Sequence, residues 1–244
     1  MAPDFEDQWR ERFEEFASAR DDDAGIAGWS PTGLAARVRR FRALWQAPDR
    51  AGGLWLDAGC GAGTYTRLLL DARQRVVGVD YSQVTLRKAA ARDLRGAAFV
   101  AADVRYLPFR PGQFDGALCL GVTQALAESG AAIDALATTL KPGAELWLDA
   151  LNGWCVIHVW GRLRRRLQGR PRHLRYESPW RMRRQMRKRG FEDVRLHWMP
   201  IAPAGSPVLR AIAESAVTMR LFRIVPPLGA LFSHAFILTG RWTG

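Results

Sequence analysis

The stretch WLDAGCGAGTYT, residues 55–66, places three glycines at alternate positions directly after a short apolar run that ends in an acid. The apolar run is typical of a buried strand, and the residues after the glycines have the pattern of a helix. A turn this rich in glycine lets a ligand approach the backbone closely. We therefore expect a strand, a tight turn and a helix here, with a binding site at the turn.

The same alternation of strand and helix continues along the chain. Short apolar runs that predict strands lie at 54–58, 75–80, 97–103, 114–120 and 144–151, and helical segments separate them. Strands that alternate with helices at this interval form a parallel sheet with helices on both faces. The predicted core is a doubly wound α/β fold, with two more strands expected at 191–199 and 234–242.

Local signals also predict where helices begin and where a loop lies. Ser30, which is followed by Pro31, and Ser82 have the pattern of N-caps. The segment DDDAGIAG at 21–28 has the pattern of a loop.

Composition and charge exclude several classes of protein. With 244 residues and 48% hydrophobic residues, the chain can bury a full core. Its three cysteines are widely spaced and lack a CxxC pair, which argues against disulfides and a zinc site, so no metal is expected. The acidic start MAPDFEDQWRERFEEF does not resemble a signal peptide, and no apolar run reaches the length of a membrane span. These features favour a cytoplasmic protein.

The spacing of glycines and acids indicates which ligand the turn takes. The glycines follow GxGxG, whereas a dinucleotide fingerprint has its third glycine one residue later, at Thr64. Asp80 ends the second predicted strand, where a carboxylate accepts hydrogen bonds from both ribose hydroxyls. Asp103 ends the third, where an acid can accept from an exocyclic amino group. Together these residues predict an adenosine ligand without phosphates.

Five motifs carry a resemblance to a known family. DAGCGAGTYT, VVGVDYS, AADVRYLPF, FDGALCLGV and LKPGAELWL resemble the successive motifs of class I S-adenosylmethionine-dependent methyltransferases, in family order. The resemblance implies a Rossmann-like seven-stranded sheet whose last strand is antiparallel. It also implies an N-terminal helical cap over 1–50 and a methyltransferase domain over 51–244, with cap insertions at 152–190 and 200–230.

The resemblance further implies which residues contact S-adenosylmethionine. Asp57 and the loop containing Gly59, Gly61 and Gly63 would meet the methionine end, since its ammonium favours an acid and its carboxylate suits backbone N–H groups. Asp80 would hold the ribose.

At the other end of the cofactor, Tyr81 would pack on the adenine ring. Asp103 and the backbone N–H of Val104 would bind the adenine edge. Leu120, just after the fourth strand, would line the opposite side. Each of these residues also has an ordinary structural interpretation as part of a turn or a helix cap, but their agreement at the ends of three adjacent strands favours a ligand site.

Catalytic residues are harder to predict, because methyl transfer consists mostly of alignment of nucleophile, methyl group and sulfur. The segment LGVTQA after the fourth strand lacks the Asn/Asp-Pro-Pro-aromatic signature of enzymes that methylate nucleic-acid nitrogens. His173 and Tyr176, in a polar loop before a helix that Ser178 caps, are the best candidates for a proton acceptor and its neighbour.

Two further segments allow several interpretations. Thirteen Arg or Lys residues lie between 162 and 189 with the single acid Glu177, which suits nucleic acid, an anionic lipid surface or a solvated helix face. Few aromatic residues interrupt this run, which disfavours RNA. Residues 207–232 are amphipathic with basic flanks, as in a lid, a peripheral membrane contact or an extra packed helix.

The leading hypothesis is an enzyme that transfers a methyl group to an oxygen atom of a small lipophilic or anionic acceptor. The alternatives are an RNA or protein methyltransferase that uses the basic surface at 162–189, and a non-catalytic or NAD-type Rossmann protein. The sequence leaves the acceptor, the role of the basic segment and the oligomeric state open.

Overall fold

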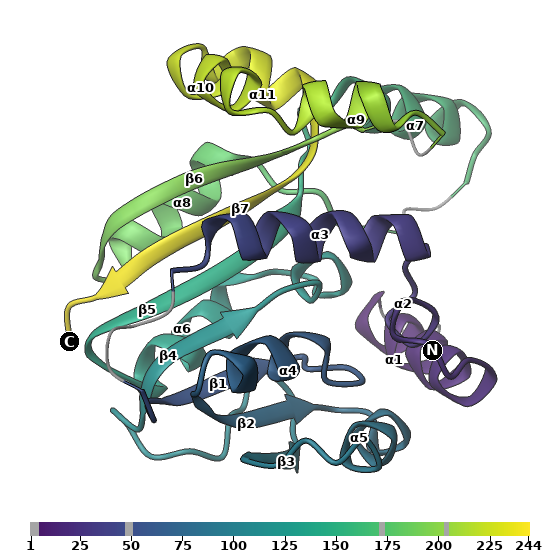
Figure 1. The fold of residues 1–244 in the computed structure, drawn as a ribbon. Coiled ribbons are helices and arrows are strands. Elements are labelled where there is room, and N and C mark those ends of the chain that lie inside the picture. Colours follow the sequence, from purple (N-terminus) through teal and green to yellow (C-terminus); the bar gives the residue numbers. More distant parts are fainter. Residues whose placement is uncertain (1–4, 47–50, 171–173, 203–204) are drawn as a thin grey trace.

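A computed structural model describes residues 5–46, 51–170, 174–202 and 205–244. In these residues seven strands form one sheet in the order β3-β2-β1-β4-β5-β7-β6 (Figure 1). β1 to β5 are parallel, and β7 runs antiparallel between β5 and β6. The strands are β1 Leu54–Ala58, β2 Arg75–Asp80, β3 Ala97–Ala101, β4 Phe114–Cys119, β5 Leu140–Leu151, β6 Phe191–Pro200 and β7 Ser233–Trp242.

Helices surround this sheet, and they begin where the sequence has capping residues. The predicted N-caps Ser30 and Ser82 are confirmed, because each side-chain oxygen accepts the backbone N–H three residues on. The helices are α1 Phe5–Ala19, α2 Asp23–Ile26, α3 Pro31–Leu44, α4 Thr64–Asp71, α5 Gln83–Ala90, α6 Gly130–Thr139, α7 Val156–Leu167, α8 Pro179–Lys188, α9 Pro207–Ala213, α10 Ala216–Ile224 and α11 Pro226–Phe232, with the 3-10 helix η1 at Thr123–Ala125.

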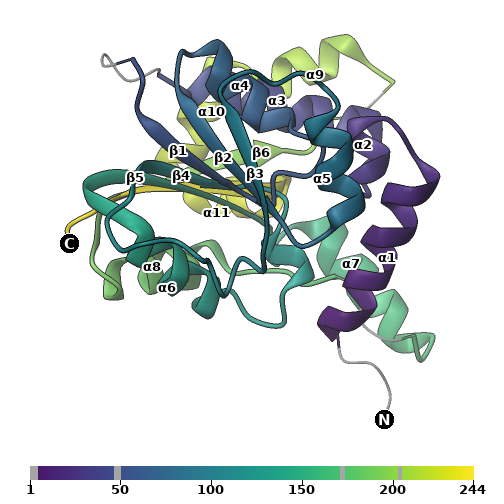
Figure 2. The same ribbon diagram turned by 90° about the horizontal axis from the view of Figure 1, so that it is seen from below.

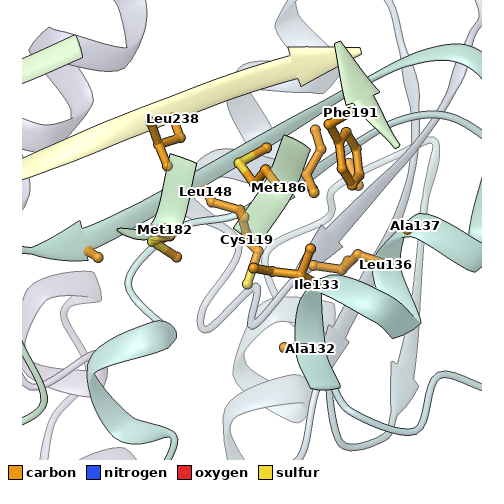
Figure 3. Packing of buried hydrophobic residues seen from close by; sticks show 14 of the residues in the cluster. Cys119, Ala132, Ile133, Leu136, Ala137, Leu148, Met182, Met186, Phe191 and Leu238 are labelled. Atoms are coloured by element: carbon orange, nitrogen blue, oxygen red, sulfur yellow. The ribbon is translucent and has the colours of Figure 1, made fainter. Parts of the chain in front are cut away.

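Two apolar clusters hold the helices to the two faces of the sheet. On one face Phe41 of α3 and Leu69 of α4 pack with Trp55 and Trp147. On the other face α6 and α8 cover the sheet, and Figure 3 shows their side chains meeting those of β4, β5 and β7. These side chains are Ile133, Leu136, Met182, Met186, Cys119, Leu148 and Leu238. This two-sided packing confirms the predicted doubly wound fold, including the antiparallel last strand.

Three local expectations need correction. The segment DDDAGIAG contains the short helix α2, because the side chain of Asp22 accepts the N–H of Gly25 and caps it. β3 ends at Ala101, so Asp103 opens the following turn rather than ending the strand. The amphipathic segment 207–232 is three short helices, since Ser215 and Pro226 each start a new one.

Helices α1 and α2 lie near the ends of the strands, whereas α3 and α8 pack on the faces of the sheet. Figure 2 shows α1 and α2 beside α5, next to the ends of β1, β2 and β3. α3 crosses in front of β5 and β7 in Figure 1. The carboxyl ends of the parallel strands therefore face the N-terminal helices, which places the candidate site between them.

We expect Gly116→Ala to lower the free energy of unfolding by about 1–3 kcal/mol, because overpacking a core forces its neighbours to shift. Gly116 pairs with Trp55 across β1 and β4, and a Cβ added there would lie 2.4 Å from the indole ring. Urea unfolding measures the change. Gly161→Ala in α7 is the control, because its Cβ would enter open space; equal stability of the two variants would contradict the tight packing.

Candidate active site

A cavity lies at the carboxyl ends of β1 to β4, and together with its opening to solvent it has a volume of about 840 Å³. It is the place where a doubly wound sheet binds its ligands. Most of the predicted cofactor residues line it, namely Gly59, Gly61, Asp80, Tyr81, Asp103, Val104 and Leu120. Asp57 and Gly63 lie outside its lining. The structure therefore brings together residues from four separate strand ends, as parallel topology requires.

The glycine loop leaves bare backbone at the cavity wall. Gly59 and Gly61 both have positive φ angles, of 75° and 53°, which favour glycine. A Cβ at Gly59 would lie 2.2 Å from the side chain of Val122, whereas a Cβ at Gly61 would enter open space. Gly59 is thus required for packing of the turn, while Gly61 leaves room at the cavity for a ligand.

The other two members of the motif stabilise the turn itself. Gly63 begins α4 in the left-handed region, and a Cβ there would lie 2.7 Å from Leu94. Asp57 is buried beneath the loop, where it accepts a 2.6 Å hydrogen bond from the hydroxyl of Thr66 in α4. Burial raises the pKa of Asp57 to about 6. A contact between Asp57 and the cofactor ammonium stays a prediction.

Asp80 connects the loop to the end of β2. Its two carboxylate oxygens accept the backbone N–H groups of Gly61, at 3.0 Å, and of Ser82, at 2.9 Å. Burial raises its pKa, although these hydrogen bonds oppose the shift. Each oxygen can accept a further hydrogen bond, since a carboxylate has about four acceptor sites. A ribose with two neighbouring hydroxyls fits this carboxylate at the cavity wall.

Asp103 is already engaged by two guanidinium groups. Arg105 donates to both of its oxygens, at 3.0 and 2.7 Å, and Arg10 of α1 donates to one of them. Burial alone would raise the pKa of Asp103, but the hydrogen bonds from Arg105 outweigh it and lower the pKa. Arg105 also pairs with Glu6 of α1. An adenine amino group would therefore share Asp103 with these arginines.

Helix α1 forms one wall of the cavity through aromatic side chains. Trp9 and Phe13 line it together with Tyr81. The rings of Phe13 and Tyr81 are 6.2 Å apart, and the Tyr81 hydroxyl donates to the carbonyl of Trp9 at 3.4 Å. Tyr81 is thus in place at the cavity, and α1 covers it.

A buried ion pair between Arg37 and Asp149 lies beside the cavity, near the end of β5. Asp149 accepts the backbone N–H of Gly121 at 2.6 Å and the Nε of Arg37 at 3.3 Å. The Arg37 guanidinium lies 3.7 Å from the ring centre of Trp29, and both Trp29 and Gly121 line the cavity. Arg37 and Asp149 were missed by the sequence analysis, because only the fold shows that α3 meets β5.

Of the two predicted catalytic residues, the structure describes only Tyr176. His173 lies outside the described residues. Tyr176 is half-buried beside His158 of α7, with ring centres 4.7 Å apart. The Nδ1 of His158 is 2.9 Å from the carbonyl oxygen of Asn152, and burial lowers its pKa. The backbone N–H of Arg175 donates to the carbonyl of Gln124, so this loop adjoins η1 at the rim of the cavity.

The described part of the chain contains no group of three His, Cys, Asp or Glu side chains that could hold a metal ion. Within the same residues, no helix has the length and apolar character needed to cross a membrane.

Comparison with known proteins connects this site to one family of domains. Residues 56–148 match a family model described as a methyltransferase domain. The chain is 30% identical over 123 residues to the Ubiquinone biosynthesis O-methyltransferase of Pseudomonas paraeruginosa, covering 47% of this chain and 52% of that protein. The chain thus spans about half the length of the curated relatives it matches.

Solved structures share the fold. A phosphoethanolamine N-methyltransferase 2 of Haemonchus contortus in complex with S-adenosyl-L-methionine is similar with a TM-score of 0.64 at 16% identity, over 95% of this chain and 60% of that chain. The cyclase SpnF is similar with a TM-score of 0.64 at 20% identity, over 99% and 97% of the two chains. At these identities the likeness concerns the fold alone.

We expect Asp80→Ala to weaken binding of S-adenosylmethionine by about 1.5–3 kcal/mol, because hydrogen bonds to a charged group have this strength. Isothermal titration calorimetry measures it. Asp115→Ala is the matched control, since Asp115 accepts the backbone N–H of Leu54 at the start of β1, at the opposite edge of the sheet. Unchanged affinity in Asp80→Ala would remove Asp80 from the cofactor site.

The raised pKa of Asp57 predicts a pH-dependent contribution to stability. The unfolded chain releases this proton near pH 3.8, whereas the folded protein holds it to about 6. Between these values the folded state binds the extra proton, so the free energy of unfolding falls as pH rises, by roughly 2–3 kcal/mol from this group.

Asp57→Asn removes the titrating group and keeps an acceptor for Thr66. Urea unfolding at several pH values should therefore show the wild type losing stability relative to the variant between about pH 4 and pH 6. A constant difference between the two proteins would contradict the raised pKa.

Proposed function

We propose that this chain, whose residues 56–148 form a class I S-adenosylmethionine-dependent methyltransferase domain, transfers the methyl group of S-adenosylmethionine to an oxygen atom of a small, lipophilic or anionic acceptor. The observation that carries the proposal is the cavity itself. Asp80 and the bare backbone of Gly61 line it together with the N-terminal aromatic residues Trp9, Phe13 and Trp29.

The residues present fit the cofactor. Asp80 would hold the ribose hydroxyls, Gly61 would leave space for the methionine part, and Val104 and Leu120 would contact the flat base. When bound, S-adenosylmethionine supplies an electrophilic sulfonium methyl group. What the protein must add is alignment, together with removal of a proton if the acceptor atom is a hydroxyl oxygen.

Two observations support a lipophilic acceptor with a hydroxyl group. Trp9, Phe13 and Trp29 line the same cavity as Asp80, and their rings suit an apolar or aromatic molecule. The curated relative at 30% identity is named an O-methyltransferase of ubiquinone biosynthesis. The match covers only about half of that relative, so its name does not identify the acceptor of this chain. The acceptor is therefore determined by the experiment below.

His158 is the proposed proton acceptor of the transfer. Its Nδ1 is fixed by the carbonyl of Asn152, which leaves Nε2 with the lone pair of the neutral ring. The lowered pKa keeps the ring neutral near pH 7, as a general base requires. It lies at the start of α7, six residues beyond Asn152, where β5 reaches the carboxyl edge of the sheet, and outside the lining of the cavity. His173 remains the alternative candidate for the base. The kinetic assay described below distinguishes His158 from His173.

The acceptor is identified by incubating the protein with S-adenosylmethionine and two fractions of a cell extract, the organic-soluble and the macromolecular. We expect a product heavier by one methylene group in the organic-soluble fraction, detected by mass spectrometry. Asp80→Ala is the negative control. Methylation that appears only in RNA or protein would overturn the proposed acceptor class while leaving the cofactor assignment intact.

With that acceptor, His158→Ala should lower kcat by about a hundredfold, the lower end for loss of a general base, without changing the affinity for S-adenosylmethionine. His197→Ala is the control, because His197 lies in β6 and hydrogen bonds to Thr239 of β7. Full activity of His158→Ala together with a loss in His173→Ala would assign the base to His173 instead.

A further inference from the structure

The exposed apolar side chains of this protein are concentrated in one region. Apart from Tyr106, every large apolar side chain that is exposed in the described residues belongs to 154–167, to Trp180 or to 208–232. These residues lie on or beside α7, α9, α10 and α11, which we call the platform. All four helices lie along the top of Figure 1, and Figure 2 shows α7 apart from α9 and α10, so that the platform is spread across that end of the molecule.

Helix α7 has the reverse of the usual orientation for an amphipathic helix. Its partly buried residues are His158, Gly161 and Arg165, whose spacings of three and four residues place them on the same face of the helix. Its apolar side chains point to solvent instead, with Trp160 67%, and Leu167 79% exposed. None of its twelve residues is buried. A helix with this arrangement has an apolar face that lacks a partner within the described chain.

The flanks of the apolar face are basic. Arg164 and Arg166 are exposed on α7, and α10 exposes Arg220 and Arg223. The single acid between residues 206 and 232 is Glu214, which is paired with Arg39 of α3. The platform therefore combines exposed aliphatic and tryptophan side chains with these exposed arginines, which form no ion pair with any acid of the described residues.

We propose that the platform binds an anionic membrane surface, with the apolar side chains of α7 and α9 inserted at the headgroup boundary and the arginines against lipid phosphates. Amphipathic helices with basic flanks bind lipid in this way, and each basic residue near an anionic surface adds to the attraction. This surface goes beyond the proposed function, and its test requires no methyl transfer.

The charge and the exposed apolar side chains favour a lipid surface over a second copy of the chain and over nucleic acid. A second copy of the chain, docked through the same face about a two-fold axis, would bring the arginines of both copies together. Nucleic acid would satisfy the arginines but would leave the aliphatic side chains of Val208, Leu209 and Ile212 exposed to water. A lipid surface matches both the charge and the apolar side chains.

The platform also connects to the active site through the chain. α7 follows the carboxyl end of β5 directly, and its His158 is the proposed base. Just before α7, the backbone N–H of Gly153 donates a 2.8 Å hydrogen bond to the carbonyl of Glu177, in the loop that also contacts η1. A lipophilic acceptor dissolved in the bilayer would thus meet the protein close to the cavity.

Vesicle sedimentation with the full chain tests the proposal. We expect binding to vesicles of phosphatidylcholine mixed with phosphatidylglycerol, at least tenfold weaker binding to phosphatidylcholine alone, and weaker binding at high salt. The double variant Trp160→Gln, Leu163→Gln should reduce binding about tenfold or more, because both side chains are exposed and would lose their insertion. Tyr106→Gln is the matched control, since Tyr106 is equally exposed outside the platform.

A charge pair of variants completes the test. Arg164→Glu with Arg166→Glu should weaken binding to the anionic vesicles about tenfold or more, whereas Arg110→Glu, in the loop before β4, should not. Calorimetry with S-adenosylmethionine verifies that each variant retains its fold and cofactor site.

Three results would overturn the proposal. These are equal binding to both kinds of vesicle, vesicle binding that survives the Trp160 and Leu163 changes, and a dimer in solution that those two changes dissociate. Binding of a single-stranded RNA that displaces the vesicles and depends on Arg164 and Arg166 alone would assign the surface to nucleic acid instead.

Discussion

The hydrogen bond between the backbone N–H of Gly61 and the carboxylate of Asp80 joins the first two strands at the point where the site forms. The glycines of the loop after β1 have positive φ angles, so the loop relies on contacts from β2 to keep one conformation. The carbonyl of Val79 accepts the N–H groups of Gly59 and Cys60, and Asp80 holds Gly61. The Asp80 carboxylate is also the group proposed to bind the ribose, so this residue contributes both to the folding of the loop and to the proposed recognition of the cofactor.

Helix α1 shows how a segment outside the sheet completes the site. Its Arg10 and Glu6 join an ionic cluster with Asp103 and Arg105, and its aromatic residues form a wall of the cavity. If adenine binds Asp103 as proposed, the packing of α1 and the occupation of the cavity would be linked energetically. An adenine that takes part of the Asp103 carboxylate would compete with a guanidinium for the same oxygens.

Sequence predicted those parts of the molecule whose signals are local. The glycine turn, the acid at the end of β2 and the caps at Ser30 and Ser82 each depend on residues a few positions apart, and the structure places them as expected. The contacts between Arg10 and Asp103 and between Arg37 and Asp149 join residues that are 93 and 112 positions apart, and nothing local indicates them. The outward face of α7 was also unpredictable, because periodicity identifies an apolar face without saying what it meets.

The position of β7 affects how the chain can fold during synthesis. β7 comes last among the strands but lies between β5 and β6, so β6 has no place in the sheet until the final strand emerges from the ribosome. Until then the outer edge of β5 is unpaired, and the apolar faces of β6 and α8 have no sheet to cover. Open edges of this kind pair readily with other chains. The order of the strands thus lets the parallel half assemble before the antiparallel half, and the edge of β5 stays open on a nascent chain until β7 has been made.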